Sequence, residues 1–323
     1  MMKVPTKLLK LIKDNDDFLI ATHMKPEGDA IGASLALAIG LKKMGKRVYL
    51  VDRDPVPYFL KFLPSSRLFR QKPPRKMYDV LLLLDCNTLE RTGFRTGLRA
   101  EKTAIVDHHI VQDNSSQSIK NALVYINPDA AATGVMVYKI LQGLNVPIDK
   151  QIATNLYTSI LVDTGGFRYS NTDTESLEIA SCLVEAGARP WEITKELYEN
   201  ATFNSIRLLT LALSTIQMKE GVAWISVTED MLRRTHTSGE DTEDFVNYPR
   251  GIKGVEVAVF FREDDSGFCK ISLRSKGRVN VAKLADSLGG GGHAAAAGCK
   301  VRGSLDAVKN EVLKKVRTAI RKR

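Results

Sequence analysis

The sequence predicts an α/β protein: a doubly wound, mostly parallel sheet followed by a smaller, mixed α/β C-terminal domain. Short apolar runs alternate with helical patterns as far as residue 163, which is typical of parallel strands joined by crossover helices. The run at 78–84 is dominated by leucine, as in a central strand buried on both faces. Beyond about residue 217 the strand-like runs follow one another more directly, which indicates a second domain.

The chain has 323 residues, which is enough for two domains of ordinary size. We expect a first domain over 1–187, a helical linker over 188–216 and a second domain over 217–323. In the first domain the pattern predicts strands at 18–21, 47–51, 78–84, 103–106 and 122–126, and helices at 30–44, 131–144 and 150–162. Later helices are expected at 191–197 and 205–213, and strands at 222–227, 255–261 and 268–273.

Composition narrows the class of protein. The four cysteines are widely scattered, which argues against a disulfide framework or zinc ribbon and favours a reducing, cytoplasmic setting. We expect no membrane association, since no run of about 18 apolar residues is present. The net charge is +10, but residues 301–323 hold eight Lys and Arg residues against two acidic residues. An apolar stripe at helical spacing there indicates a terminal surface helix, so the charge is weak evidence for nucleic-acid binding.

The first predicted strand ends in a segment that contains His23, Glu27 and Asp29. Open α/β sheets bind ligands in the crevice beyond the carboxyl ends of their strands. One imidazole and two carboxylates form a hard nitrogen and oxygen ligand set, as manganese or magnesium prefers. Taken alone, the segment also fits a simpler interpretation, with Asp29 as a helix N-cap and His23 as a loop residue.

Metal-capable side chains follow two further predicted strands and one helix. Asp85 ends the run at 78–84, residues 107–109 (Asp-His-His) end the next strand, and Asp163 follows the helix at 150–162. Carboxyl ends of parallel strands meet at one edge of a sheet, so these side chains should converge. About four carboxylates placed together do not all stay ionised without cations. Two divalent ions would neutralise Glu27, Asp29, Asp85 and Asp163, with His23 and His108 as neutral ligands.

At this point the sequence resembles the DHH phosphoesterase superfamily. Its four N-terminal motifs correspond to THMKPEGDAIG at 22–32, LD at 84–85, VDHH at 106–109 and LVDTG at 161–165. The C-terminal half resembles the substrate-binding domain associated with this superfamily, in the segments SLRS at 272–275, VNVA at 279–282 and GGGGHAAAAG at 289–298. The resemblance spans nearly the whole chain, and the branch it suggests is the nanoRNase and pAp phosphatase group.

The resemblance implies two metal ions, most readily Mn²⁺, with Mg²⁺ or Co²⁺ as alternatives. It assigns one ion to His23, Glu27 and Asp85, and the other to Asp29, Asp85, His108 and Asp163, with Asp85 as the bridge. It further implies that Asp107 orients His108 and that His109 faces the substrate phosphate, as a phosphate ligand or as a general acid. Glu27 departs from the aspartate usual at this position, which leaves the metal preference open.

In the C-terminal domain the resemblance implies that the substrate is bound by Arg274, Ser275, Gly290, Gly291, Gly292 and His293. The glycines alone also fit a flexible turn after a helix at 279–288. Bare backbone would let a nucleotide phosphate approach amide N–H groups. No Gly-x-Ser-x-Gly elbow or Walker motif is present, which argues against serine hydrolases and P-loop NTPases.

The function expected from the resemblance is hydrolysis of short RNA or DNA oligonucleotides, and of pAp, by attack of a metal-activated water on phosphorus. A pAp-specific phosphatase, a hydrolase of linear dinucleotides such as pApA, and a polyphosphate hydrolase keep the same metals and change the substrate. A catalytically idle nucleotide-binding protein is the alternative from another class. A homodimer is a candidate assembly.

Overall fold

The computed structural model describes residues 3–73, 75–94, 96–109, 119, 121–264, 267–292 and 294–321. The chain forms two compact units, Met1–Asn200 and Ala201–Arg323. The boundary between them falls inside the segment predicted to be a linker, and the proposed division at 187 and 217 stays a prediction. His293, one of the expected substrate residues, lies outside the described residues.

The first unit contains a six-stranded parallel sheet in the order β3-β2-β1-β4-β5-β6, the order of doubly wound folds. Its central strand β4 pairs with β1 on one side and β5 on the other. This position explains the run of leucines, because both faces of the strand are buried. The strands are β1 (Asp17–Ala21), β2 (Arg47–Val51), β3 (Phe69–Arg70), β4 (Tyr78–Leu84), β5 (Ala100–Asp107) and β6 (Leu123–Ile126).

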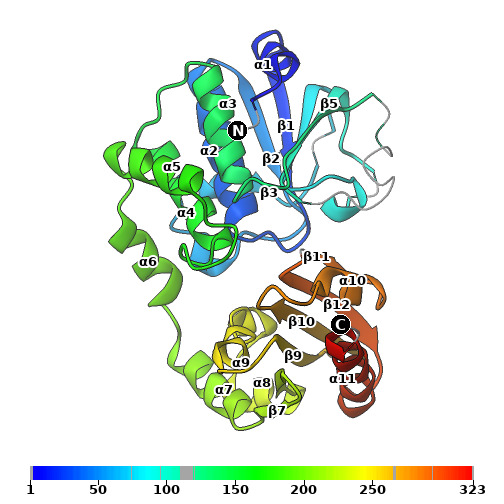
Figure 1. Cartoon of the computed structure of the whole chain (residues 1–323). Coiled ribbons are helices and arrows are strands. Elements are labelled where there is room, and N and C mark those ends of the chain that lie inside the picture. The colour runs from blue at the N-terminus through cyan, green and yellow to red at the C-terminus, as the bar shows by residue number, and fades with distance from the viewer. Residues whose placement is uncertain are drawn as a thin grey trace. The chain divides into compact units, whose positions relative to one another are not determined.

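Helices cover one face of this sheet (Figure 1). Alternate strand residues such as Phe18 and Ile20 pack against them, while Leu19 and Ala21 face a second core formed with the segment between β4 and β5. The α-helices are α1 (Thr6–Lys13), α2 (Gly28–Lys43), α3 (Thr133–Gly143), α4 (Lys150–Asp163), α5 (Thr174–Glu185) and α6 (Pro190–Tyr198). Short 3₁₀ helices are η1 (Tyr58–Leu60), η2 (Ser66–Leu68) and η3 (Glu90–Thr92).

Helix α2 is buried on nearly all sides, because it packs against the sheet and against α3 and α4. This burial explains its uniformly small and apolar sequence. The close approach of α2 to α4 needs glycine. A Cβ added at Gly32 would overlap the backbone oxygen of Asn155.

The second unit is a mixed sheet in the order β11-β12-β10-β9-β8-β7. Only the β8–β9 pair is parallel among the described pairs. One face packs against α10 and α11, and the other against α7, α8 and α9. The strands are β7 (Gln217–Lys219), β8 (Val222–Val227), β9 (Val257–Asp264), β10 (Phe268–Ser275), β11 (Gly291–Gly292) and β12 (Ala296–Arg302). The helices are α7 (Phe203–Leu213), α8 (Glu229–Thr235), η5 (Gly239–Thr242), α9 (Asn247–Gly251), α10 (Val281–Asp286) and α11 (Leu305–Arg321).

Two features of the second unit differ from expectation. The helix predicted at 279–288 is shorter, because the side chain of Asn280 caps the amide groups of Ala282 and Lys283 and fixes its start. The glycines that follow are not only a turn: Gly291 and Gly292 form β11 and pair with β12. Within the described part of the chain, every helix is too short or too polar to span a lipid bilayer.

We expect Gly32→Ala to lower the free energy of unfolding by about 1–3 kcal/mol, because the new methyl group must push α2 away from α4. Thermal unfolding followed by circular dichroism measures this change. Gly251→Ala is the matched control, since nothing lies within 4 Å of its Cβ position. Equal melting temperatures for the two variants would show that the two helices have room to separate.

Candidate active site

The candidate metal ligands gather at the carboxyl edge of the parallel sheet. His23 follows β1, Asp85 follows β4 and His108 follows β5. Asp29 lies in the first turn of α2, and Asp163 is the last residue of α4. The adjacency of β1, β4 and β5 therefore brings together residues that are far apart in the sequence.

The described residues contain three groups of potential ligand atoms, and one of them joins Asp85, His108 and His109. The other two hold the candidate ligands, and Asp85 connects them. In each of the sets His23–Glu27–Asp85 and Asp29–His108–Asp163, the ligand atoms lie within 4.8 Å of one another. His23 Nε2 is 3.3 Å from Asp85 Oδ2, and His108 Nε2 is 3.6 Å from Asp85 Oδ1. One carboxylate thus faces both imidazoles, one oxygen to each.

His108 Nε2 also faces the other two carboxylates of its group. It lies 3.4 Å from Asp29 Oδ2 and 3.5 Å from Asp163 Oδ2. Three carboxylates therefore converge on one buried nitrogen, because Asp85 is the third.

The orientation of the imidazole rings fits a divalent cation. Nδ1 of His23 is 2.9 Å from the carbonyl oxygen of Met24, and Nδ1 of His108 is 3.0 Å from that of Ala130. A carbonyl only accepts, so each Nδ1 donates its proton, and in the neutral ring Nε2 presents a lone pair to the carboxylates. His23 Nε2 and Asp85 Oδ2 are buried without a hydrogen-bond partner in the described part of the chain. A lone pair facing carboxylate oxygens is the arrangement that a metal ion would stabilise.

The first turn of α3 holds two of the carboxylates. The amide groups of Thr133 and Gly134 donate to Asp29 at 2.8 and 3.1 Å, and the hydroxyl group of Ser159 donates to the same carboxylate. The Thr133 hydroxyl group donates to Asp85 Oδ1 at 3.0 Å. The N-terminus of a helix favours negative charge, so α3 fixes the direction of both side chains.

The hydrogen bonds of Asp107 differ from the role expected for it. Asp107 was expected to orient His108, but its Oδ1 accepts from the amide and from the ring Nδ1 of His109, at 3.0 and 2.7 Å. Asp107 therefore orients His109, and the carbonyl group of Ala130 orients His108.

Burial and mutual repulsion disturb the carboxylates when no cation is present. Burial raises the pKa of Asp163 to about 8, and burial together with the charge of Asp85 raises the pKa of Asp29 to about 6. Burial also disfavours the charge of Asp85, but His109 and His23 outweigh it and hold the pKa of Asp85 well below its ordinary value. The metal-free centre therefore keeps protons that a bound cation would displace.

The backbone at Asp85 is unusual, with a left-handed φ of 55° directly after β4. Aspartate tolerates this conformation better than most residues, although it costs free energy. The change of backbone direction ends the strand at the position where the carboxylate meets both imidazoles.

The expected substrate residues of the second unit lie around the end of β10. Ser275 is buried, and its hydroxyl oxygen accepts from the amides of Gly277 and Val279 at 3.1 and 3.3 Å. Arg274 donates from Nη1 to the carbonyl oxygen of Leu273 at 3.1 Å. These bonds shape the turn after the strand.

The glycines before position 293 do not all have the same cause. A Cβ at Gly290 would overlap the backbone of β12, and Gly292 has a φ of 139°, so packing and backbone conformation require glycine at both. Nothing lies within 4 Å of the Cβ position of Gly291. Of Gly290, Gly291 and Gly292, Gly291 is thus the position at which neither packing nor backbone conformation requires a glycine.

Sequence patterns missed the groups that hold the ligands. Ser159 lies one helical turn before Asp163 on α4, and this spacing was the available signal that both face the centre. Asn171 donates from Nδ2 to the carbonyl oxygens of Ala131 and Asp163, at 2.9 and 3.1 Å. Asp52 at the end of β2 is buried, with Oδ2 unpartnered among the described residues, and burial raises its pKa to about 7.

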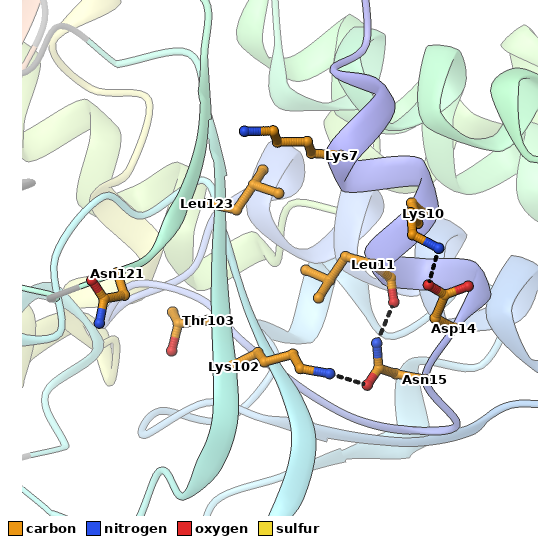
Figure 2. Close-up of a pocket in the computed structure, with 9 residues that line it drawn as sticks. All are labelled: Lys7, Lys10, Leu11, Asp14, Asn15, Lys102, Thr103, Asn121 and Leu123. Carbon is orange, nitrogen blue, oxygen red and sulfur yellow. Dashed lines mark hydrogen bonds and ion pairs between the residues drawn. The ribbon is translucent and has the colours of Figure 1, made fainter.

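A separate pocket of about 300 Å³ lies between α1 and the starts of β5 and β6 (Figure 2). Its lysines are partly paired within the pocket: Lys10 Nζ is 2.7 Å from Asp14, and Lys102 donates to Asn15 at 2.9 Å. Its lining contains no histidine and no candidate metal ligand. It therefore is not part of the metal centre.

Comparison with known proteins agrees with this geometry. The sequence model described as the DHH family, N-terminal domain, matches residues 17–160, and that of the DHHA1 domain matches residues 224–322. The bifunctional oligoribonuclease and PAP phosphatase NrnA of Thermus thermophilus is 35% identical over 98% of this chain and 93% of its own. Its namesake from Bacillus subtilis is 27% identical over 92% of this chain and 93% of its own.

Among solved structures, an exopolyphosphatase-related protein from Bacteroides fragilis matches with a TM-score of 0.84 and 27% identity, covering 100% of this chain and 98% of its own. The parallel sheet, the carboxylate and imidazole centre and these matches define the class of protein, a phosphoric ester hydrolase. The chain belongs to the DHH family of phosphoesterases, and it carries the DHHA1 domain in its second unit.

We expect the metal-free protein to lose stability as the pH rises from about 4 to about 8. The pKa values of Asp163 and Asp29 are raised to about 8 and about 6, so the folded chain holds protons that the unfolded chain releases near pH 4. The resulting stability is present at low pH and is lost as the pH passes each folded value. Thermal unfolding in a chelator should give a lower melting temperature at pH 8 than at pH 5.

Added Mn²⁺ should remove most of this difference, because the cation replaces the protons. In chelator, Asp163→Asn should show a weaker pH dependence than the natural chain, since its side chain does not titrate. A metal-free protein that becomes more stable between pH 5 and pH 8, with no change in the variant, would contradict the raised pKa values.

Proposed function

We propose that the protein is a divalent-metal-dependent phosphodiesterase that degrades short oligonucleotides and removes phosphate from pAp. The observation that carries the proposal is Asp85, whose two oxygens face the His23 group and the His108 group. Relatives named as bifunctional oligoribonuclease and PAP phosphatase match almost the whole chain, which supports the same substrates here.

The donor set suits two ions that share one carboxylate. We assign one ion to His23, Glu27 and Asp85, and the other to Asp29, Asp85, His108 and Asp163. Oxygen-rich sites with one or two imidazoles suit Mn²⁺, with Mg²⁺ or Co²⁺ as alternatives. When bound, such ions would lower the pKa of a water molecule and neutralise charge on the attacked phosphate.

Glu27 reaches this set in spite of its departure from the usual aspartate. It is the N-cap residue of α2 and is exposed, while its carboxylate lies in the group with His23 and Asp85. The longer side chain thus still brings its carboxylate to the group, which supports a retained site and leaves the metal preference open.

Side chains beside the candidate metal ligands are placed to bind the substrate phosphate. Asp107 fixes the backbone and ring of His109 through one oxygen, and we assign His109 to contact the substrate phosphate. Burial lowers the pKa of His109, but the charge of Asp85 and the hydrogen bond to Asp107 outweigh it and hold that pKa well above its ordinary value. A protonated His109 would bind a phosphate oxygen by a charge-assisted hydrogen bond, and the alternative role is proton donation to the leaving oxygen.

We assign binding of the rest of the substrate to the second unit, through Arg274, Ser275, Gly290–Gly292 and His293. Gly291 supports this role, because nothing lies within 4 Å of its Cβ position and a substrate could approach it there. A pAp-specific phosphatase, a pApA hydrolase and a polyphosphate hydrolase would use the same centre. An idle nucleotide-binding protein would not need a complete donor set with oriented imidazoles.

We propose a cytoplasmic location, because all four cysteines are free and suit a reducing compartment. A homodimer stays a prediction.

A time course with Mn²⁺ tests the substrates. We expect the purified protein to release adenosine monophosphate from pAp and mononucleotides from RNA of two to five nucleotides, faster than from RNA of ten nucleotides. Hydrolysis of pAp alone would select the specific phosphatase, and hydrolysis of polyphosphate alone would remove the nucleotide substrates. Binding of nucleotides with no turnover at any Mn²⁺ concentration would support the idle protein.

We expect Asp85→Asn to retain less than a tenth of the activity under saturating Mn²⁺, because a neutral amide does not bridge two cations. A tenfold loss corresponds to about 1.4 kcal/mol of barrier. Removal of a ligand that binds only one ion can already cost this much, so the loss for a ligand shared by two ions should be larger. Initial rates on the dinucleotide measure the effect, and circular dichroism checks the fold. Asp129→Asn is the control, since that aspartate is exposed and lies in the loop before α3. An Asp85→Asn protein with more than a tenth of the activity would exclude the bridging role.

A further inference from the structure

Arg91 lies at the edge of the metal centre, in a segment that sequence motifs did not single out. It belongs to η3, between β4 and β5. The amide of Met24 donates to the Arg91 carbonyl oxygen at 2.8 Å, so η3 is fastened to the loop that carries His23 and Glu27. The backbone of Arg91 is therefore placed as firmly as that loop.

The guanidinium group is close to a buried carboxylate but does not bond to it. Arg91 Nη1 is 4.0 Å from Asp107 Oδ2, which is too long for a hydrogen bond. Asp107 is fully buried, and its Oδ2 has no hydrogen-bond partner in the described part of the chain. The Arg91 side chain is 35% exposed and makes no hydrogen bond to a described residue. A structural ion pair would normally close this gap, because an unpaired buried carboxylate oxygen is costly.

Asp107 connects Arg91 to the residue already assigned to the phosphate. Its Oδ1 accepts from His109, and its Oδ2 faces Arg91. The imidazole and the guanidinium group therefore flank one carboxylate, and the partly exposed guanidinium group has donors that no described residue accepts. A planar guanidinium group matches two oxygens of a phosphate better than a point charge does.

We infer that Arg91 is a phosphate-binding residue of the catalytic unit and that it favours phosphomonoesters over phosphodiesters. This inference rests on the proposed function only in that the protein hydrolyses phosphate esters. A terminal phosphate carries close to two negative charges at neutral pH, and a diester carries one. The guanidinium group pairs with two oxygens of the terminal phosphate, so its removal costs the monoester more. Arg91 thus sets the balance between removal of a terminal phosphate and cleavage of an internucleotide bond.

The test uses artificial esters, which have no nucleoside for the second unit to bind. We expect Arg91→Ala to lower kcat/KM for p-nitrophenyl phosphate by about 10–100-fold, the usual worth of a hydrogen bond to a charged group. The loss on bis-p-nitrophenyl phosphate should be several-fold smaller. Arg91→Lys should recover part of the loss, because it restores the charge without the planar fork. Arg53→Ala is the matched control: Arg53 donates to the sulfur of Met24 on the same loop and should change either rate less than twofold.

Calorimetric titration with Mn²⁺ distinguishes two roles of Arg91: binding of the substrate phosphate, and a purely structural role in keeping Asp107 and the metal centre in place. Unchanged Mn²⁺ affinity in Arg91→Ala, with the unequal losses above, supports the inference. Equal losses on both esters, a matching loss of Mn²⁺ affinity, or full activity of the variant would each overturn it. If the natural chain hydrolyses both esters but no nucleotide, the proposed substrates fail, and the assignment of Arg91 still stands or falls by these ratios.

Discussion

The structure depends on the cost of placing like charges together out of water. Asp29, Asp85 and Asp163 surround His108 Nε2 at 3.4–3.6 Å, in a region from which water is largely excluded. Protons or cations must neutralise this group, and the hydrogen bonds from α3 and the tautomers set by two carbonyl groups prepare it for cations. The sheet, the helix ends and the residues that hydrogen-bond to these carboxylates and imidazoles are arranged around this one electrostatic requirement.

The sequence predicted those parts of the fold that local patterns encode. Strands β2, β4 and β8 have the predicted bounds, because each is a compact apolar run that ends at a polar residue or turn. The convergence of Asp85 and His108 also followed from the sequence, since carboxyl ends of parallel strands share one edge. The roles of these residues as metal ligands remain predictions.

Contacts between distant residues had no local signal. Asp29 is held by Thr133, which is 104 residues away, and by Ser159, which is 130 residues away. The pairing of Asp107 with His109 instead of His108 depends on how the chain turns after β5, and the position of Arg91 depends on η3 packing against the first motif. Tertiary structure decides such contacts, and the residue pattern within one segment does not contain them.

The close packing of α2 against α4 has a consequence for how the centre is preserved. Asp29 is carried by α2 and Asp163 by α4. The two helices pack closely, because a Cβ at Gly28 would overlap the side chain of Val162 and one at Gly32 would overlap the backbone oxygen of Asn155. The packing of α2 against α4 thus sets the separation of the two carboxylates. A substitution within this helix contact would therefore change the distance between the two carboxylates without altering either candidate ligand.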